Sequence, residues 1–321
     1  MTHEANALVA DIGGTNTRVA LASGPMLHAE TIRHYRNADY PGLEPILRAY
    51  LAEQPARVAG ACVAAAGPVR DGVAELTNLN WRMSVASIAG ATGALRVALL
   101  NDLQAPGHAV ARLPATSLRL ILPAAAGTPD PGPMAPRLVM NVGTGFNAVP
   151  VHPLAQGNLV PASECGHVSL PVHGADDLSL MAFVTSAHGF PSVEDVLSGR
   201  GLERVDHWAA GGQGPERAAA QIMAAILAGN DARAAKAGAM FVRIMGAVAG
   251  NLALTHLPFG GIYLIGGVAK RFAPLLADLG FGRAFHDKGR FSEFMEAFPV
   301  WSVEDEHAAL QGCAVHLDSL R

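Results

Sequence analysis

Glycine-rich turns beside apolar runs are the feature of this sequence that most directly suggests chemistry. There are four: Gly13-Gly14, Gly143-Thr144-Gly145, Gly260-Gly261 and Gly266-Gly267. Glycine lets a backbone approach a ligand closely, and successive N–H groups in such turns bind anions. Thr15, Asn16 and Thr144 add side-chain donors beside two of the turns. One such turn is most simply an ordinary strand end, but several in one chain favour a phosphate-binding protein.

The common phosphate and dinucleotide motifs do not account for these turns. The sequence has no GxxxxGK[ST] motif, and none of its lysines, Lys236, Lys270 and Lys288, follows a strand in such a motif. Phosphate would therefore be held by backbone donors, hydroxyls and a metal ion. Residues 143–148 fit the GxGxxA dinucleotide pattern, but that motif requires a helix directly after it. Val149-Pro150-Val151 is typical of a strand instead, which disfavours a dehydrogenase.

Asp102 is the carboxylate placed best for catalysis. It follows the apolar run Leu95–Leu100 and precedes a predicted helix, so it would lie at the carboxyl end of a strand. Open α/β sheets bind their ligands at that end. Aspartate is also a good helix N-cap. The residues alone leave both roles open, general base or cap.

The periodicity predicts strands and helices in a definite order. Leu8–Asp11 and Thr17–Leu21 form a hairpin around Gly13-Gly14, and Leu27–His34 is a candidate third strand. Helices and strands then alternate. The expected helices are Pro41–Glu53, Val85–Thr92 and Leu103–Arg112, and the expected strands are Val58–Ala65 and Leu95–Leu100. This order predicts a mixed sheet with helices packed on it.

A second hairpin repeats the first one. Leu138–Val142 and Phe146–Val151 enclose Gly143–Gly145, and aligning Asp11 with Asn141 also aligns Val19 with Val149, an offset of 130 residues. The similarity predicts two related halves, each opening with a hairpin that has a glycine-rich turn. The second half continues with two long helices and a buried strand, expected at Glu216–Leu227, Arg233–Leu257 and Ile262–Ile265.

Composition limits the class of protein. The chain has 321 residues, half of them apolar, which suits a packed core and about two domains. Its net charge of −4 gives no basic nucleic-acid footprint. Cys62, Cys165 and Cys313 stand far apart without a CxxC pair, which disfavours a disulfide framework or a zinc ribbon and suits a reducing cytoplasm.

Membrane and secretory segments are not expected. Residues 1–7 lack a basic segment followed by an apolar one, which a signal peptide requires. The most apolar stretch, Ala237–Leu257, is interrupted by Arg243, Asn251 and His256, so we expect a buried helix there. The sequence therefore predicts a soluble, cytoplasmic protein with no membrane partner.

These motifs together resemble a known superfamily. Residues 11–16, with sequence DIGGTN, resemble the first phosphate motif of the hexokinase, actin and heat-shock chaperone superfamily. Asn141–Gly145 resembles its second phosphate motif, and Gly261–Gly267 its adenosine motif. Within this superfamily the chain resembles bacterial glucokinases of the non-ROK type along nearly its whole length. The supporting segments are Asn101–Ala105, Glu164–His167, Glu194–Gly199 and Asp287–Phe291.

The resemblance implies an α/β fold of two domains, the actin-like ATPase fold with a duplicated ribonuclease H-like core and an interdomain cleft. The small domain is expected at residues 1–108, completed by a C-terminal helix at 308–321, and the large domain at 109–307. Two departures from the family pattern bear on the sugar. Cys165 replaces the usual glycine, and Phe146 stands where leucine is frequent. They leave the preferred hexose open.

The activity implied is ATP-dependent phosphorylation of glucose to glucose 6-phosphate, with Asp102 as general base. The residues expected to bind the sugar are Asn101, Asp102, Glu164, His167 and Glu194. The residues expected to bind the nucleotide are Asp11, Gly13, Gly14, Thr15, Asn16, Thr144, Gly145, Gly266 and Gly267, with Asp11 also holding Mg²⁺ through water. The expected ligands are glucose, ATP and Mg²⁺, and a homodimer is one option for the assembly.

Several of these residues also fit a purely structural role. Glu194 could be a charge on a helix surface, His167 a core histidine and Glu164 a solvated loop residue. Arg18, Lys270 and Arg290 could assist phosphate binding, although each is more simply a surface charge.

Other functions fit parts of the pattern. A kinase for fructose, mannose or another hexose would use the same residues. A sugar sensor would ordinarily need a DNA-binding module, which the seven residues before Leu8 are too few to form. An actin-like or chaperone-like ATPase would turn over ATP without sugar.

Overall fold

The computed structural model describes residues 7–54, 56–76 and 79–320. The chain forms two compact units, each built from several segments. Unit 1 comprises Met1–Pro114, Val151–Ala162 and Asp305–Arg321, and unit 2 comprises Ala115–Pro150 and Ser163–Glu304. The large domain expected at 109–307 also includes residues 109–114, 151–162 and 305–307, which belong here to unit 1.

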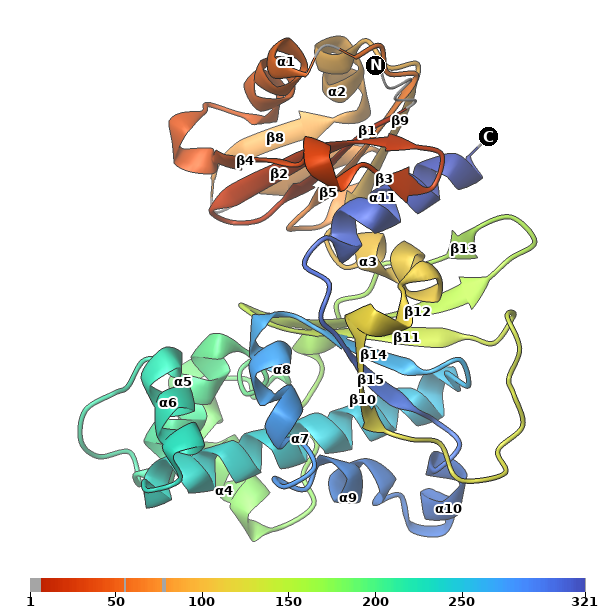
Figure 1. Cartoon of the computed structure of the whole chain (residues 1–321). Coiled ribbons are helices and arrows are strands. Elements are labelled where there is room, and N and C mark those ends of the chain that lie inside the picture. The colour runs from red at the N-terminus through yellow and green to blue at the C-terminus, as the bar shows by residue number, and fades with distance from the viewer. Residues whose placement is uncertain (1–6, 55, 77–78, 321) are drawn as a thin grey trace. The chain divides into compact units, whose positions relative to one another are not determined.

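Unit 1 is organised around a mixed sheet with the strand order β3-β2-β1-β5-β9, and β4 also pairs with β2 (Figure 1). Strands β1, β5 and β9 run parallel, while β2 pairs antiparallel with β1. The strands are β1 Ala7–Ile12, β2 Asn16–Ser23, β3 Met26–Leu27, β4 Arg33–Arg36, β5 Gly60–Ala65 and β9 Arg96–Asn101. The predicted opening hairpin is therefore confirmed.

The expectation of a single third strand over Leu27–His34 is wrong. A 3-10 turn at Ala29–Thr31 separates β3 from β4. The buried Thr31 hydroxyl donates to the His28 carbonyl oxygen at 2.6 Å and accepts from the Leu21 N–H at 2.9 Å. These side-chain bonds replace strand pairing and turn the chain, as threonine hydroxyls often do.

Alternating side chains of β1 supply two separate cores. Leu8, Ala10 and Ile12 pack with α1 Leu43–Glu53 and α2 Val85–Thr92. Val9 faces the opposite side, with the C-terminal helix α11 Ala308–Ser319. This period of two is what a strand buried on both faces requires. A small antiparallel sheet completes unit 1, with β6 Val69–Arg70, β7 Val73–Leu76 and β8 Trp81–Ser84.

Helix α11 packs against the sheet and against α3 Gln104–Ala109. Gly312 permits this contact, because a Cβ at that position would lie 1.6 Å from the Ala105 carbonyl oxygen. The rings of His108 and His316 meet between the two helices, with their centroids 4.3 Å apart. The expected helix over Leu103–Arg112 is shorter than predicted, because it tightens into a 3-10 turn at Val110–Arg112.

The second mixed sheet has the order β10-β15-β14-β11-β12-β13. Strands β11, β14 and β15 run parallel. The strands are β10 Leu118–Leu122, β11 Arg137–Val142, β12 Phe146–Pro153, β13 Asn158–Leu159, β14 Ile262–Ile265 and β15 Val300–Val303. Strand β12 continues past Pro150, so its last residues and β13 belong to unit 1.

The two sheets share one topology. The order β2-β1-β5-β9 in the first matches β12-β11-β14-β15 in the second, with a hairpin followed by two parallel strands in both. The 130-residue offset between the hairpins therefore corresponds to a repeated fold.

Unit 2 is helix-rich, and α7 Ala232–His256 is its central helix. More than half of the residues of α7 are buried, including Phe241, Ile244 and Met245, which pack in one core with residues of β11 and β14. By length and composition α7 could span a membrane, but 72% of its most apolar window is buried inside the fold, which explains its composition.

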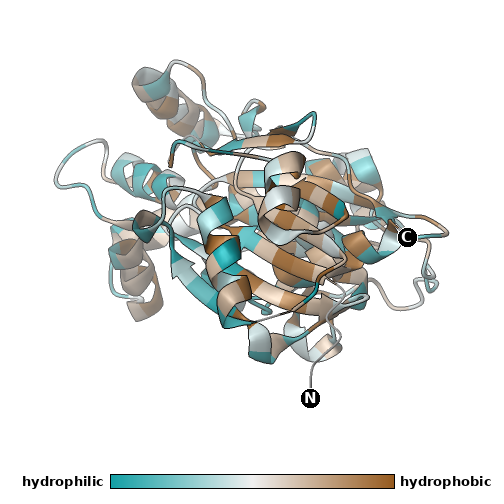
Figure 2. Cartoon of the chain, turned by 90° about the horizontal axis from the view of Figure 1, so that it is seen from above, coloured by the Kyte–Doolittle hydropathy of each residue, from teal (hydrophilic) through white to brown (hydrophobic). Residues whose placement is uncertain are grey.

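The other helices are α4 Ala175–His188, α5 Gly199–Ala209, α6 Ala219–Ala228, α8 Gly267–Phe272, α9 Phe281–His286 and α10 Ser292–Met295. Figure 2 shows most helices carrying both polar and apolar residues, as expected for helices with one buried face.

Helix α6 begins at Ala219 and not at the predicted Glu216. The residues before it are held by a partly buried ion-pair network instead of a helical turn. Arg217 pairs with Asp206, which is fully buried, and with Asp231, which caps α7.

The histidine pair between α3 and α11 predicts an acid-sensitive stability. Burial, aided by the neighbouring His316, lowers the pKa of His108 from 6.5 to about 3, and burial also lowers the pKa of His316. Between about pH 3 and pH 6.5, His108 binds a proton in the unfolded chain but not in the folded chain. The free energy of unfolding therefore falls as the pH drops below about 6.5. For His108 alone we expect a loss of about 2 kcal/mol at pH 5.

Chemical denaturation at pH 7.5 and pH 5 measures this effect. The His108→Leu variant should show a smaller difference between the two pH values than the parent protein. The exposed His34 provides the control, and His34→Gln should keep the full difference. An unchanged difference in His108→Leu would contradict the assignment.

Candidate functional site

The carboxyl ends of β1, β5 and β9 bring three predicted site residues to one edge of the unit 1 sheet. Ile12 is in register with Ala65, and Ala65 with Asn101. The Asp102 N–H then donates to the Ala65 carbonyl oxygen at 3.0 Å. Asp11, Asn101 and Asp102 therefore belong to the edge at which α/β sheets bind ligands.

Asp102 is an exposed residue of a tight turn, and it is not at the N-cap position of α3. That position is Leu103, which has no side-chain cap. The turn is held by its neighbours. Asn101 Oδ1 accepts from the Leu103 N–H, and Asn101 Nδ2 donates to the Gly67 carbonyl oxygen, both at 2.9 Å. Gln104 Oε1 accepts from the Asn101 N–H at 3.0 Å.

Asp11 is 8% exposed and pairs with Arg18, its cross-strand partner in the β1–β2 hairpin. Arg18 Nε lies 3.1 Å from Asp11 Oδ2, and Arg18 Nη1 donates to the Glu306 carbonyl oxygen at 2.5 Å. Arg18 is thus an ion-pair partner of a predicted site residue and not an isolated surface charge.

The first glycine turn presents exposed residues on a buried support. Gly14, Thr15 and Asn16 are exposed, and the Gly13 N–H donates to the Asn16 carbonyl oxygen at 3.0 Å. Asn37, which is 2% exposed, donates its amide to the Gly13 carbonyl oxygen at 2.8 Å. Sequence reasoning missed Asn37, which no spacing connects to the turn.

In unit 2 the second glycine turn meets the glycines that follow β14. The Gly143 N–H donates to the Gly145 carbonyl oxygen, and Gly199 N–H donates to the Gly143 carbonyl oxygen, both at 2.9 Å. Gly266 has a φ of 99°, and a Cβ there would lie 2.4 Å from Asn141 Oδ1. Only glycine fits where the ends of β11 and β14 approach so closely.

Glu194 links this turn to the loop that carries Glu164 and His167. Glu194 Oε2 accepts from the Phe146 N–H, and the Glu194 N–H donates to the Gly166 carbonyl oxygen, both at 2.9 Å. Glu194 is half-buried in a turn, so the alternative of a helix-surface charge is wrong. Glu164 and His167 are on the loop, and His167 is exposed, so it is not a core histidine.

Cys165 is partly buried. Its thiol donates toward Asn147 Oδ1 at 3.5 Å and toward the Ala148 carbonyl oxygen at 3.7 Å. Burial raises the pKa of Cys165, which disfavours the reactive thiolate. Phe146 is also buried, 3% exposed, in the core of unit 2.

Lys270 and Arg290, which were suggested to assist phosphate binding, both contact groups of the protein itself. Lys270 Nζ donates to the Glu304 carbonyl oxygen at 3.1 Å. Arg290 lies over the ring of Phe291, with 5.3 Å between the guanidinium carbon and the ring centroid.

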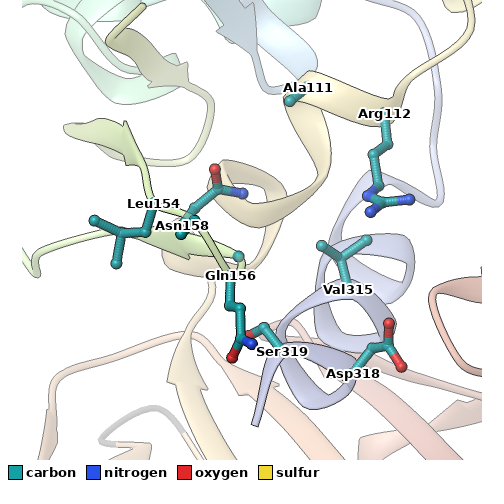
Figure 3. A pocket seen from close by; sticks show the side chains of 10 residues that line it. Ala111, Arg112, Leu154, Gln156, Asn158, Val315, Asp318 and Ser319 are labelled. Atoms are coloured by element: carbon teal, nitrogen blue, oxygen red, sulfur yellow. The ribbon is translucent and has the colours of Figure 1, made fainter. Parts of the chain in front are cut away.

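The predicted residues fall into two groups, and each is assembled within its own unit. Unit 1 holds Asp11, Gly13, Gly14, Thr15, Asn16, Asn101 and Asp102, and unit 2 holds Thr144, Gly145, Glu164, His167, Glu194, Gly266 and Gly267. A separate cavity of about 590 Å³ in unit 1 contains none of them (Figure 3). It lies between the β12–β13 hairpin and α11, with Arg112, Asn158 and Asp318 among its lining residues.

Comparison with known proteins places this chain in a family. A family model described as Glucokinase matches residues 8–320. The chain belongs to the glucokinase family. It is 35% identical to the glucokinase of Chromobacterium violaceum over 314 residues, which cover 97% of this chain and 88% of that protein.

Solved structures agree with this membership. The crystal structure of a glucokinase from an Antarctic psychrotroph matches with a TM-score of 0.85 at 31% identity, covering 97% of this chain and 98% of that one. A ROK family glucokinase from Streptomyces griseus, in complex with glucose and AMPPNP, matches at 19% identity with a TM-score of 0.63, covering 96% of this chain and 97% of that one. The chain therefore has the mixed α/β fold that glucokinases share with ROK sugar kinases.

Gly166 is another glycine of this site that leaves no room for a side chain. A Cβ there would lie 2.1 Å from the Phe146 carbonyl oxygen, so backbone would have to move. We expect Gly166→Ala to lower the unfolding free energy by at least about 2 kcal/mol. Gly90→Ala in α2, where a Cβ meets nothing within 4 Å, should be neutral or raise it by up to about 1 kcal/mol. Denaturant unfolding measures both, and a neutral Gly166→Ala would show that the loop packs differently.

Proposed function

We propose that this glucokinase family member transfers the γ-phosphoryl group of ATP to the primary hydroxyl of glucose, giving glucose 6-phosphate and ADP. The observation that carries the proposal is the Asp102 turn at the carboxyl edge of three parallel strands, in a chain whose relatives are named glucokinases. Phosphoryl transfer needs positioning, charge neutralisation and a group that accepts the hydroxyl proton.

Asp102 accepts the proton of the primary hydroxyl as that oxygen attacks the γ-phosphorus. Its turn is fixed on both sides by backbone and side-chain hydrogen bonds, so the carboxylate starts from a defined backbone. A positioned general base of this kind contributes about 10²–10⁴-fold to the rate.

Asn101, Glu164, His167 and Glu194 bind the other hydroxyls of the sugar. Carboxylates accept hydroxyl protons, while amide and imidazole groups both donate and accept. Glu194 Oε2 is already engaged by the Phe146 N–H, which fixes the orientation of its carboxylate. Such a site rejects sugars whose missing hydroxyls would leave its polar groups unpaired.

The glycine turns bind ATP. The turns at Gly13–Asn16 and Gly143–Gly145 offer backbone N–H groups and the hydroxyls of Thr15 and Thr144 to the phosphates. Gly266 and Gly267 let the nucleoside lie close to the backbone. The AMPPNP complex of the related ROK family glucokinase supports ATP as the donor.

The chain's acidic residues suit a hydrated metal ion better than a caged one. Over residues 7–54, 56–76 and 79–320, no three His, Cys, Asp or Glu side chains lie together as a metal site. Mg²⁺ keeps most of its water and needs few carboxylates. Since Arg18 engages Asp11 Oδ2, the other carboxylate oxygen would accept a hydrogen bond from metal-bound water. Mg²⁺ would neutralise charge on the transferring phosphates.

The two departures from the family pattern give no reason to expect another hexose. Phe146 is buried in the core, and the Cys165 thiol points toward Asn147 and Ala148. A panel of glucose, mannose and fructose with coupled ADP detection tests the proposal, and we expect the highest kcat/KM for glucose. ADP release without sugar, or a clear preference for fructose, would contradict it.

The base assignment predicts a selective loss of turnover. Asp102→Asn should lower kcat by about 10²–10⁴-fold, because the amide cannot accept the proton. Glucose binding, measured by calorimetry, should persist. Asp71→Asn, which changes an exposed aspartate of the same unit, should leave both unchanged. Near-normal turnover in Asp102→Asn would remove this residue from the role.

A further inference from the structure

The side chain of Asn147 forms hydrogen bonds with the backbone on both sides of Glu164, and we call this pair of hydrogen bonds the bracket. Asn147 lies on β12, next to the buried Phe146. Its Nδ2 donates to the Ser163 carbonyl oxygen, and its Oδ1 accepts from the Cys165 N–H at 3.2 Å. The two backbone groups that flank Glu164 are therefore paired with a single amide, much as a neighbouring strand would pair them.

The bracket stabilises the backbone of Glu164 in a conformation that belongs to neither a helix nor a strand. Glu164 has φ −130° and ψ 40°, outside the strand and helix regions. The amide itself is oriented, because Oδ1 also accepts from the Ala148 N–H at 2.9 Å and lies 3.5 Å from the Cys165 Sγ. The Asn147 amide is thus held by its own strand, β12, as well as by the loop.

The rest of the loop is held by different contacts. Gly166 packs on the Phe146 carbonyl oxygen, and its own carbonyl oxygen accepts from the Glu194 N–H. Loss of the Asn147 amide would therefore leave the Ser163 carbonyl oxygen without this donor and the Cys165 N–H with Ser163 Oγ, at 3.2 Å, as its remaining acceptor. The attachment at Gly166 would stay intact. The expected result is a misplaced carboxylate on a folded protein.

We propose that Asn147 is a positioning residue for sugar binding, which sets the direction of the Glu164 carboxylate through the peptide groups on either side of it. The inference rests on the proposed function, in which Glu164 binds a hydroxyl of glucose. Cys165 takes part through its N–H and thiol, so this residue, which departs from the family pattern, belongs to the bracket.

A double-mutant cycle between Asn147 and Glu164 tests the proposal. Asn147→Ala removes two hydrogen bonds to the loop, and we expect the KM for glucose to rise about tenfold. The kcat and the KM for ATP should stay within about twofold, because the change affects one substrate. Glu164→Ala should raise the KM for glucose at least as much. In the Glu164→Ala background, Asn147→Ala should add less than about twofold, because the carboxylate that it positions is gone.

Each outcome decides a separate point. If Asn147→Ala raises the KM equally in both backgrounds, it acts by another route and the proposal fails. If Glu164→Ala raises the KM and Asn147→Ala does not, the bracket is unimportant while the sugar contact stands. If Glu164→Ala leaves the KM unchanged, the sugar contact of the proposed function fails and the positioning role fails with it.

Two further variants separate positioning from folding. Asn158→Ala removes another asparagine bonded to a backbone carbonyl, that of His108, and should change neither KM. Asn147→Asp keeps the acceptor for Cys165 and Ala148 but loses the donor to Ser163, so its KM should lie between the parent and Asn147→Ala. If thermal melting shows that Asn147→Ala does not fold, the same cycle with Asn147→Asp decides the question.

Discussion

The in-register pairing of three parallel strands is the constraint on which the candidate site depends. Ile12, Ala65 and Asn101 end neighbouring strands at one level, so the residues that follow them emerge together. The chain can then place Asp11 and Asp102 at one edge although the two residues are 91 positions apart in sequence (102 − 11 = 91). A register shift of one residue would turn these side chains to the other face of the sheet.

The second sheet has the same strand arrangement, and there the close approach of the strand ends requires glycine. The ends of β11 and β14 come so close that a side chain at Gly266 would overlap Asn141 and Val142. Gly166 meets the backbone of Phe146 in the same way. Gly145 leaves room for the Glu194 carboxylate, which bonds to the backbone of β12, because a Cβ at Gly145 would lie 2.5 Å from Glu194 Oε2. The glycines are therefore required by packing as well as suited to phosphate.

Periodicity in the sequence was enough to predict some of the regular elements, but strands β6, β7, β8, β10 and β15 and helices α4 and α5 were not predicted. Val85–Thr92 and Ile262–Ile265 have the predicted bounds, since compact apolar segments with clear ends define them. Predictions were wrong where side chains compete with the backbone. The hydrogen bonds of the Thr31 hydroxyl interrupt the predicted strand. The ion pairs of Arg217 hold the residues before α6, so that helix begins later than predicted. Neither interaction gives a periodic pattern in the sequence.

The site was predictable to the extent that motifs mark it. The glycine turns and Asp102 could be found from residue types next to apolar runs. Their supports could not, because Asn37, Gln104 and Asn147 act on backbone groups 24, 3 and 16 residues away in sequence. A single asparagine or glutamine carries no periodic signal, so only the folded chain identifies these partners.

A crystal structure with glucose and a non-hydrolysable ATP analogue tests the central claim most directly, because it measures the distance between an Asp102 carboxylate oxygen and the sugar's primary hydroxyl oxygen. We expect a hydrogen bond of about 2.6–3.2 Å between them. A glucose-bound structure in which Asp102 faces bulk solvent and another group contacts that hydroxyl would contradict the assignment of Asp102 as the base.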